Sequence, residues 1–372
     1  MSRPTDSALA ILHVDPERAM AGGETQVLGL VRELAALGDR QTLAADPDGP
    51  LARAVAGLGV AVAPLRIRNH LDVLAGRRLA GLLARQRYDI VHFHTARAHA
   101  MSIFLGRRPR VRRVVTRRMD YPLRGGGYAR WLYDRGADAV VAISEGVREA
   151  LVASGVQRAR IAVVPSGVDA ERFALDTAVS AAQRRRLGLA DDEIALAIVG
   201  ALEERKGHDV LLEAVASLGD LRLRVLCAGS GSLAPALAAR RDALGLGERV
   251  RFLGQVEDVA ALLAAVDVVV MPSRHEGLGV AALEAMAAGR PVIASRVGGL
   301  PEAVGDAGTL VPSGDPRALA EAIRRLALDP LARRALGEAG RRRVAERFTL
   351  GAMARGTRAV YRELVPARGA AA

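Results

Sequence analysis

The chain alternates between short apolar runs and stretches with helical spacing from residue 8 onward. Strand-length apolar runs bounded by polar residues or glycine indicate buried strands. Helical spacing separates them, notably over 24–37, 71–87 and 145–153. In the first half we predict strands at 8–14, 41–45, 60–65, 89–94, 113–116, 139–143 and 161–164. Because strands that alternate with helices form parallel sheets covered on both faces, this half is predicted to be an α/β domain.

A second series of the same kind begins at Ile194. Its strands are predicted in the segments IALAIVG, LRVLCA, RVRFLG, 266–271, 291–294 and GTLVP. Helices are predicted at 280–288, 316–328, 330–346 and 350–364. We therefore expect two Rossmann-like domains, 1–170 and 193–349, joined by a polar linker over 171–192.

The stretch from Met271 to Glu302 carries the densest set of candidate site residues. A strand that ends near Met271 is followed by a loop with Gly277 and Gly279 and then by an alanine-rich helix. In an open parallel sheet this loop lies at the carboxyl edge, where ligands bind. The glycines allow close backbone approach, and the amides at a helix start attract an anion or an oxygen-rich group.

Two carboxylates frame this loop. Glu276 precedes the helix, and Glu284 lies within it among residues suited to packing. A buried carboxylate is costly unless donors reach it, and the two hydroxyls of a ribose would supply them. The spacing alone leaves an alternative open, in which Glu276 caps the helix and Glu284 pairs with an arginine.

The segment EGLGVAALEAMAAGRPVIASRVGGLPE resembles the signature of the retaining glycosyltransferases of family 4, whose two glutamates are separated by seven residues. The resemblance implies a GT-B fold, in which two Rossmann-like parallel-sheet domains face each other across a cleft that holds the active site. It also implies that Glu276 and the backbone at Gly277, Leu278 and Gly279 hold the transferred sugar. Glu284 would hold the ribose of a nucleotide-sugar.

Weaker similarities to the same family run along the rest of the chain. Lys206, the single lysine of the protein, stands where the family has a lysine for the donor diphosphate. Arg205 beside it would replace an arginine that the family usually has after the preceding strand. Gly22 and Gly23 match a glycine pair that approaches the diphosphate in relatives, although most such pairs only form turns. The last helix, 350–366, would cross back to the first domain.

One glycine pattern suggests a different class of enzyme. Gly229-x-Gly231-x-x-Ala234 fits the dinucleotide fingerprint, which makes an NAD-dependent oxidoreductase the first alternative. Such a site requires an acidic residue at the tip of the next strand, and RVRFLG has none there. We therefore predict that Gly229 and the turn with Val256 form a wall of the nucleotide pocket. A GT-B-fold isomerase is a further alternative.

Composition indicates which residues build the core and in which cellular compartment the protein is expected. Half of the residues are hydrophobic and only 3% are aromatic, so alanine, leucine and valine must build the core. The single cysteine, Cys227, excludes a disulfide framework and is typical of a reducing cytoplasm. We expect neither a signal peptide nor a transmembrane span, because no segment has the required pattern or length. The sequence therefore predicts a cytoplasmic protein.

One segment carries as much net charge as the whole chain. Residues 77–130 contain fourteen arginines and two acids, and the formal net charge of the protein is +12. Such a surface attracts nucleic acid, an anionic membrane or a phosphorylated acceptor. Nucleic acid is disfavoured, because aromatic residues are not interleaved and no nucleic-acid motif is present. An arginine-rich solvated surface is the remaining alternative.

Three residues of this half are candidates for acceptor binding. His94 ends a strand and shares one face with His92, without a third metal ligand nearby in the sequence. At the end of the next strand many family members have a histidine, whereas here Arg118 follows Arg117. A fixed cation there favours an anionic acceptor, such as a lipid-linked or lipopolysaccharide-type glycan. The protein would then lie on the inner face of the cell membrane, in envelope polysaccharide biosynthesis.

The predicted reaction needs neither a metal nor a cofactor. Asp46-Pro47-Asp48 spells an Asp-x-Asp metal motif, but its proline and the following Gly-Pro predict a turn. Lys206 and the glycine-loop amides would instead stabilise the leaving diphosphate. We expect retaining transfer of a sugar from a UDP-, GDP- or ADP-linked donor to a glycan or lipid-linked acceptor.

Overall fold

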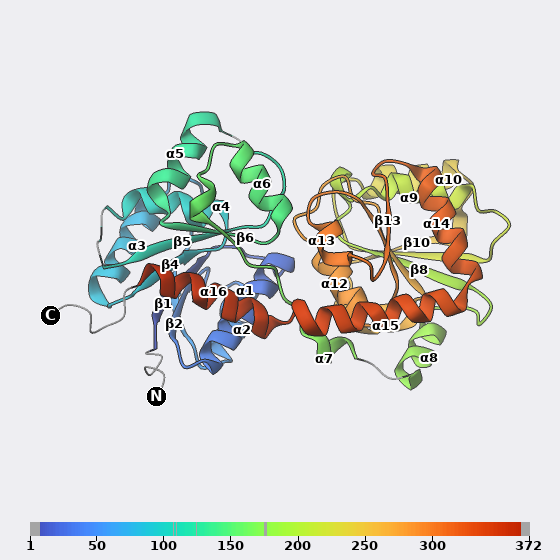
Figure 1. Ribbon diagram of the computed structural model, residues 1–372, viewed down its shortest axis with the longest axis horizontal. Coiled ribbons are helices and arrows are strands. Elements are labelled where there is room, and N and C mark those ends of the chain that lie inside the picture. Colours follow the sequence, from blue (N-terminus) through green and yellow to red (C-terminus); the bar gives the residue numbers. More distant parts are fainter. Residues whose placement is uncertain (1–7, 107, 109, 124, 175–176, 366–372) are drawn as a thin grey trace. The chain divides into compact units, whose positions relative to one another are not determined.

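The computed structural model describes residues 8–106, 108, 110–123, 125–174 and 177–365. They form two compact units. The first unit is Met1–Gly167 together with Leu350–Ala372, and the second is Val168–Thr349. Each unit is built on its own parallel sheet (Figure 1). The predicted α/β class is therefore confirmed.

The first unit has a seven-stranded sheet in the order β3-β2-β1-β4-β5-β6-β7, with parallel pairs throughout. The order reverses between β1 and β4, and ligands bind beside such a switch point at the carboxyl ends of the strands. The strands are β1 (Ala10–Asp15), β2 (Arg40–Ala45), β3 (Ala61–Pro64), β4 (Ile90–Phe93), β5 (Arg112–Arg117), β6 (Ala139–Ala142) and β7 (Ile161–Val163). The helices are α1 (Gly22–Ala36), α2 (Pro50–Ala56), α3 (Val73–Arg85), α4 (Ala96–Ala100), α5 (Gly126–Gly136), α6 (Glu145–Ala153) and α16 (Leu350–Leu364), with the 3-10 turns η1 (Met101–Phe104) and η2 (Arg158–Arg160).

Helix α16 belongs to the first unit, although the chain reaches it only after passing through the second. Its Tyr361 is fully buried in an apolar cluster with Ile11 of β1. Close packing on α1 depends on Gly29, because a Cβ there would lie 2.6 Å from Leu350 Cδ2. The helix thereby covers the central strands of the first sheet.

The second unit has a six-stranded sheet in the order β10-β9-β8-β11-β12-β13, again with parallel pairs. Its order reverses between β8 and β11, which places a switch point there. The strands are β8 (Ile194–Val199), β9 (Leu223–Ala228), β10 (Val250–Gly254), β11 (Val268–Met271), β12 (Val292–Ser295) and β13 (Thr309–Val311). The helices are α7 (Ala170–Phe173), α8 (Thr177–Arg186), α9 (His208–Ala216), α10 (Ala234–Ala243), α11 (Val259–Ala265), α12 (Val280–Ala287), α13 (Leu300–Val304), α14 (Pro316–Leu328) and α15 (Pro330–Arg347), with the 3-10 turns η3 (Glu204–Lys206) and η4 (Gly247–Arg249).

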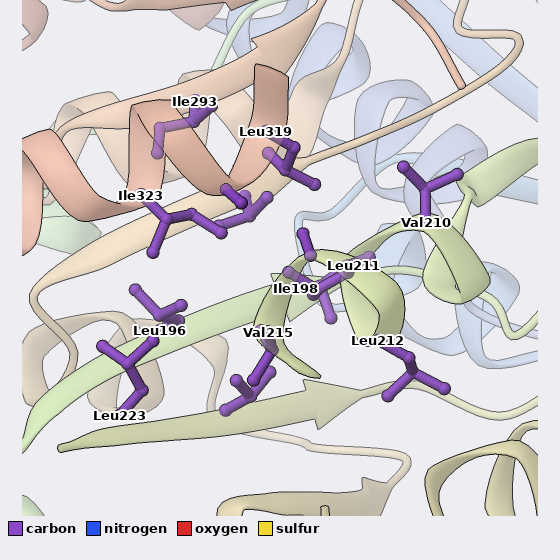
Figure 2. Packing of buried hydrophobic residues seen from close by; sticks show 14 of the residues in the cluster. Leu196, Ile198, Val210, Leu211, Leu212, Val215, Leu223, Ile293, Leu319 and Ile323 are labelled. Atoms are coloured by element: carbon purple, nitrogen blue, oxygen red, sulfur yellow. The ribbon is translucent and has the colours of Figure 1, made fainter. Parts of the chain in front are cut away.

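An apolar layer fixes the central strand of the second sheet (Figure 2). Leu196 and Ile198 are two residues apart on β8, so both point to the same face. Side chains of α9 and α14 pack around them, and the labelled ones are Val210, Leu211, Leu212, Val215, Leu319 and Ile323. Because β8 is held in this way, the loop that follows it begins from a rigid position.

The segment 171–192, which we expected to be a linker, contains α8 and most of α7 and belongs to the second unit. Ser180 Oγ donates to Ala264 O at 2.6 Å, and Arg184 Nη1 donates to Ala265 O at 3.0 Å. These bonds attach α8 to the end of α11. The polar composition that indicated a linker therefore reflects side chains that bind helix-terminal carbonyls.

Most predicted helices agree with the structure, and α6, α14 and α16 have the predicted bounds. The helices that the sequence prediction did not name are all eleven residues long or shorter, namely α2, α4, α5, α7, α8, α10, α11 and α13. Among the described residues, no helix combines the length and the apolar character that crossing a membrane requires.

Candidate active site

The switch point of the second unit brings together two residues that are far apart in the sequence. Lys206 ends the turn after β8, and Glu276 lies in the loop after β11. Because β8 and β11 are neighbours, Lys206 Nζ forms an ion pair with Glu276 Oε2, and each side chain is 12% exposed. The structure thus unites two predicted catalytic residues in one largely buried pair.

Backbone contacts hold these two loops in register. A Cβ on Gly207 would lie 2.0 Å from Pro272 O, so only glycine permits this approach. The carbonyl of Arg205 accepts from the amides of Arg274 and His275 at 2.8 and 3.3 Å. The position of Glu276 therefore depends on the loop that carries Lys206.

The side chain of Arg205 does not join this pair. Its Nε donates to Glu203 Oε2 at 2.7 Å, and Glu203 is half exposed. Among the described residues, this is the one ion pair of the Arg205 guanidinium. The backbone of Arg205, rather than its charge, is what orders the neighbouring loop.

The predicted sugar-binding loop is compact and mostly buried. Gly277, Leu278 and Gly279 are all buried, and Gly279 adopts φ 92° as the N-cap of α12. A Cβ on Gly279 would also lie 2.5 Å from Leu300 Cδ2. This glycine is therefore required both by its backbone conformation and by the packing of Leu300.

Glu284 is the one carboxylate of α12, and it lacks a protein donor. Among the described residues it forms no hydrogen bond and no ion pair through its side chain. Burial raises the pKa of this carboxyl to about 7, and the charge of Arg172 opposes the shift. The alternative predicted an arginine paired directly with Glu284. Among the described residues no arginine forms that pair.

Gly229 and Val256 lie on neighbouring loops at the same edge of the sheet. A Cβ on Gly229 would lie 1.9 Å from Gly200 O, so the glycine lets β9 end against β8. Its amide donates to Gly254 O at 2.7 Å, and Val256 follows two residues later. The glycine fingerprint thus serves close packing of three loops, and it lies after β9 rather than after the first strand of the unit.

In the first unit, Arg118 faces the start of α1. Its Cδ and Nε lie 3.8 Å from the position of a Cβ on Gly23, the neighbour of Gly22 in the first turn. Burial lowers the pKa of Arg118, and the carboxyls of Asp15 and Glu24 oppose this. With other described residues Arg118 makes no hydrogen bond, so its N–H donors are available to a ligand.

Asp15, the last residue of β1, is buried in the same place. Burial raises the pKa of its carboxyl to about 7, and the amide of Glu17, which donates to Asp15 Oδ1 at 3.1 Å, opposes this. Asp15 is a site residue that the sequence reasoning missed. Its position at the carboxyl end of the first strand was the available signal.

Arg117 has a different environment from Arg118, because successive side chains of a strand point to opposite faces. Arg117 Nε donates to Met119 O at 3.2 Å, and Nη2 donates to Tyr121 O at 2.9 Å. Its guanidinium also lies 5.0 Å from the centre of the Tyr121 ring. Arg117 therefore orders the following loop.

His94 belongs to a buried cluster of three histidines. No third metal ligand for His92 and His94 was expected from the sequence, but the neighbouring strand β1 contributes His13, and ring nitrogens of all three lie within 4.8 Å of one another. His92 binds Tyr361 Oη at 2.5 Å and Thr116 Oγ1 at 2.7 Å. Burial lowers the pKa of His13 to about 4 and the pKa values of His92 and His94 well below 6.5.

Hydrogen bonds determine where the protons of this cluster lie. Gln41 Nε2 donates to Val31 O, so Gln41 Oε1 accepts from His13 Nε2 at 3.0 Å. His13 Nδ1 then accepts from His94 Nε2 at 3.0 Å, which leaves His94 Nδ1 unprotonated and, within the described chain, unpartnered. Three imidazoles this close can ligate a metal ion. Because most of their nitrogens are already hydrogen-bonded and Arg118 adds positive charge, the arrangement favours a neutral network.

The other charged motifs have local partners. Asp46 pairs with Arg18 at 3.3 Å and with Arg66 at 3.4 Å, and Asp48 also pairs with Arg66. The Asp46–Asp48 segment forms the turn before α2, as its proline predicted. Two arginines of the basic window 77–130, Arg107 and Arg124, lie outside the described residues.

Comparison with known proteins identifies related sequences for both units. A family model described as "Glycosyltransferase Family 4" matches residues 20–172, and one described as "Glycosyl transferases group 1" matches residues 193–329. A D-inositol 3-phosphate glycosyltransferase of Geodermatophilus obscurus is 38% identical over 307 residues, which are 76% of this chain and 64% of that protein. A protein of the same name from Kineococcus radiotolerans is 39% identical over 258 residues, 63% of this chain and 59% of that protein. The chain thus spans about half to two thirds of the length of these relatives.

Solved structures with the same architecture extend over nearly the whole chain. Anabaena Alr3699/HepE in complex with UDP-glucose has a TM-score of 0.83 at 22% identity, covering 95% of this chain and 99% of that one. Sucrose-phosphate synthase from Thermosynechococcus elongatus has a TM-score of 0.79 at 26% identity, covering 96% and 99%. The predicted fold, two Rossmann-like parallel-sheet domains, is therefore confirmed.

Proposed function

The chain belongs to glycosyltransferase family 4, and we propose that it transfers a sugar from a nucleotide-sugar to a phosphorylated acceptor with retention of the anomeric configuration. The relatives' names support glycosyl transfer to a phosphorylated polyol. An NAD-dependent oxidoreductase is not favoured, because the glycine fingerprint serves loop packing and both family models describe glycosyl transfer.

The observation that carries this proposal is the pairing of Lys206 with Glu276 at the switch point of the second unit. An ammonium beside a carboxylate is suited to a ligand that has both a diphosphate and sugar hydroxyls. In the proposed complex Lys206 binds the diphosphate, while Glu276 accepts hydrogen bonds from the sugar. The amides at Gly277, Leu278 and Gly279 bind the same donor, and Arg205 takes part through its backbone.

The ribose of the donor is assigned to Glu284. Its carboxylate has no protein donor among the described residues, and two adjacent hydroxyls would satisfy it. Gly229 and Val256 would form the wall beside the base. We propose a uridine diphosphate donor, because Anabaena Alr3699/HepE, a protein of the same fold, has been solved with UDP and with UDP-glucose.

The proposed chemistry uses no protein nucleophile. The bond from the anomeric carbon to the diphosphate oxygen breaks, and the acceptor oxygen bonds to the same face of that carbon. The acceptor proton passes to the leaving diphosphate, whose growing negative charge Lys206 stabilises. We include in this proposal that neither a metal nor a cofactor is required.

Arg118 would bind the phosphate of the acceptor. No described residue bonds its N–H donors, and the first turn of α1, with Gly22 and Gly23, lies next to it and favours an anion. His94 offers an unprotonated Nδ1 nearby. A cyclitol phosphate, a lipid-linked phosphate and a lipopolysaccharide-type glycan all have the required charge, and the last two would place the protein on a membrane in envelope biosynthesis.

A panel of nucleotide-sugars tests the donor half of the proposal. We expect calorimetric titration to give the tightest binding for a UDP-sugar, and Glu284→Gln to weaken it ten- to a hundredfold, because each hydrogen bond to a charged group contributes about 1.5–3 kcal/mol. Glu338→Gln, an exposed change on α15, is the matched control. Unchanged affinity in a folded Glu284→Gln variant would remove Glu284 from the donor site.

The product tests the reaction itself. We expect release of UDP and an acceptor glycoside with the anomeric configuration of the donor, as read from its proton NMR coupling. Inverted product, or release of UDP and sugar with no glycoside of any phosphorylated acceptor, would contradict the proposal.

A further inference from the structure

A large cavity lies in the first unit, at the amino-terminal edge of its sheet. It has a volume of about 890 Å³, and its walls come from the starts of β5 and β6, the end of α5, and η1 and η2. Two of its lining residues are acidic, Asp134 and Asp138. Five are arginines, namely Arg108, Arg112, Arg113, Arg135 and Arg160. The cavity is therefore strongly positive.

Neutral groups hold these guanidinium groups in place. Arg112 Nε donates to Leu364 O at 3.1 Å, and Arg108 donates to Leu105 O and Ala80 O, each at 3.2 Å. Arg113 and Arg160 donate to the last carbonyls of α5 and the residue after it. Carbonyl partners orient a guanidinium without cancelling its charge. Much of the positive charge thus stays available to an anion.

The two carboxylates of the cavity compensate only part of the charge of its five arginines. Asp138 Oδ2 accepts from the backbone amide of Arg113 at 2.7 Å. Asp134 lies 3.9 Å from Arg160 and 3.8 Å from Arg130. Arg135 is exposed and makes no side-chain bond with any other described residue.

Two buried polar atoms beside the cavity also lack partners. Ser102, a lining residue, is 1% exposed, and its Oγ has no hydrogen bond to the described chain. The same holds for Nε2 of His99, which is also 1% exposed. Gly136 makes room for both, because a Cβ there would lie 2.3 Å from Ser102 Oγ and 3.2 Å from His99 Nε2. A buried polar atom needs a hydrogen-bond partner, and a ligand in the cavity can supply one to Ser102.

Aromatic side chains lie at the cavity and beside it. Trp131 lines it from α5 and is 47% exposed. Tyr128, one turn earlier, is equally exposed, and the two rings are stacked with their centroids 6.1 Å apart. Exposed Trp and Tyr beside arginine suit a ligand or a bilayer interface with both apolar and anionic parts.

We propose that this cavity binds a phosphate-bearing ligand through its arginines, with Ser102 donating to a phosphate oxygen and Trp131 against the uncharged part of the ligand. The site is separate from the proposed acceptor site. Arg112 begins β5 and Arg117 ends it, so the cavity and Arg118 lie at opposite ends of the same strand. At about 3.3 Å per residue the strand separates them by roughly 17 Å, so the ligand is a tether or an effector rather than a reacting group.

The protein contains a single tryptophan, and it lines this cavity. Its fluorescence therefore reports this site and not the donor site of the second unit. We expect inorganic pyrophosphate to change Trp131 emission saturably. Arg112→Gln and Arg135→Gln should each raise the half-saturating concentration roughly tenfold or more.

Arg53→Gln on α2 is the matched control, because it removes the same charge from an exposed site of the same unit. It should leave the titration unchanged. Arg135→Gln guards against a folding defect, since the side chain of Arg135 has no partner to lose in the described part of the chain. If emission did not respond to pyrophosphate or to anionic lipid, or if Arg53→Gln shifted the midpoint as much as Arg112→Gln, the site would be refuted.

Vesicles distinguish the source of the phosphate. Phosphatidylglycerol vesicles, but not phosphatidylcholine vesicles, should shift Trp131 emission to the blue if the ligand is a lipid headgroup, and pyrophosphate should compete. A response to pyrophosphate alone would assign the cavity to a soluble phosphorylated ligand. Both results support the same phosphate chemistry, and an equal response to both vesicle types would contradict it.

Discussion

The two units share one strand order around their switch points but place different chemistry there. In the second unit the loops after β8 and β11 hold an ion pair, Lys206 with Glu276. In the first unit, β1 and β4 carry neutral histidine side chains. Asp15, whose carboxyl has a raised pKa, lies at the end of β1. The same architecture therefore presents a charged pair in the second unit. In the first unit it presents a buried histidine network and Arg118, whose guanidinium no described residue bonds.

This difference fits two halves of one reaction. A diphosphate leaving group develops charge in the transition state, and a fixed ammonium stabilises it most when it is partly desolvated. An acceptor must be held and oriented, which neutral hydrogen-bonding groups and one cation for its phosphate accomplish at lower desolvation cost than several buried charges would. The predictions below test whether the units divide the work in this way.

The largest effect is expected in the second unit. Lys206→Ala removes the ammonium group that pairs with Glu276, and we expect the turnover number to fall roughly a hundred- to a thousandfold. Steady-state rates at saturating donor and acceptor measure this. Lys206→Arg should restore part of the rate because it restores the charge.

Arg222→Ala is the control for Lys206. Arg222 is exposed in the same unit and pairs with Asp192, so its loss should leave turnover unchanged. Wild-type turnover in Lys206→Ala, or an equal loss in Arg222→Ala, would show that the ion pair at the switch point has no catalytic part.

The second prediction concerns which unit unfolds first at low pH. Among the described residues, each unit has one carboxyl whose pKa burial raises to about 7, Asp15 in the first unit and Glu284 in the second. The first unit has four buried histidines with lowered pKa values and the second has one among the described residues; they are His13, His92, His94, His99 and His208. We therefore expect the first unit to unfold first on acidification.

The direction of the pH dependence follows from the number of protons that the folded and unfolded states bind. A histidine with a lowered pKa stays neutral in the folded state while the unfolded chain is protonated, so stability is lost as pH falls from 6.5 towards 4. For His13 alone this loss is on the order of 3 kcal/mol. The carboxyls act oppositely, because their stabilisation is lost as pH rises through about 7. Amide exchange should show β1 and β4 losing protection at a higher pH than β8 and β9; the reverse order would contradict the prediction.

The smallest expected effect distinguishes the role of Arg118 from that of its neighbour Arg117. Arg118→Gln should raise the KM for a phosphorylated acceptor about tenfold and weaken its dependence on salt, because it removes a charge-assisted contact. Arg117→Gln should instead lower the melting temperature, since Arg117 bonds the carbonyls of the loop after β5. If both variants changed KM equally, the opposite orientation of the two side chains would have no bearing on acceptor binding.

The sequence by itself determined the elements and the donor loop. Apolar runs and helical spacing are local properties, so they located strands such as β11 and helices such as α14 within a few residues. Gly279 could be singled out for the same reason, because its positive φ and its N-cap position are set by nearby residues. The resemblance of this segment to a known signature then gave Glu276, Glu284 and Lys206 their expected roles.

Only the tertiary structure decided which of these residues meet. Strand order depends on burial across a whole sheet, and it alone places Lys206 beside Glu276 and His13 beside His94. The alternation of a strand could be read from the sequence, but the partners on each face could not, so Arg117 and Arg118 were not distinguished. The arginine cavity is assembled from segments as far apart as Ser102 and Arg160, which no local pattern connects. The spacing of apolar residues along the chain determines the local pattern of helices and strands. Contact between distant segments depends instead on how their apolar faces pack together.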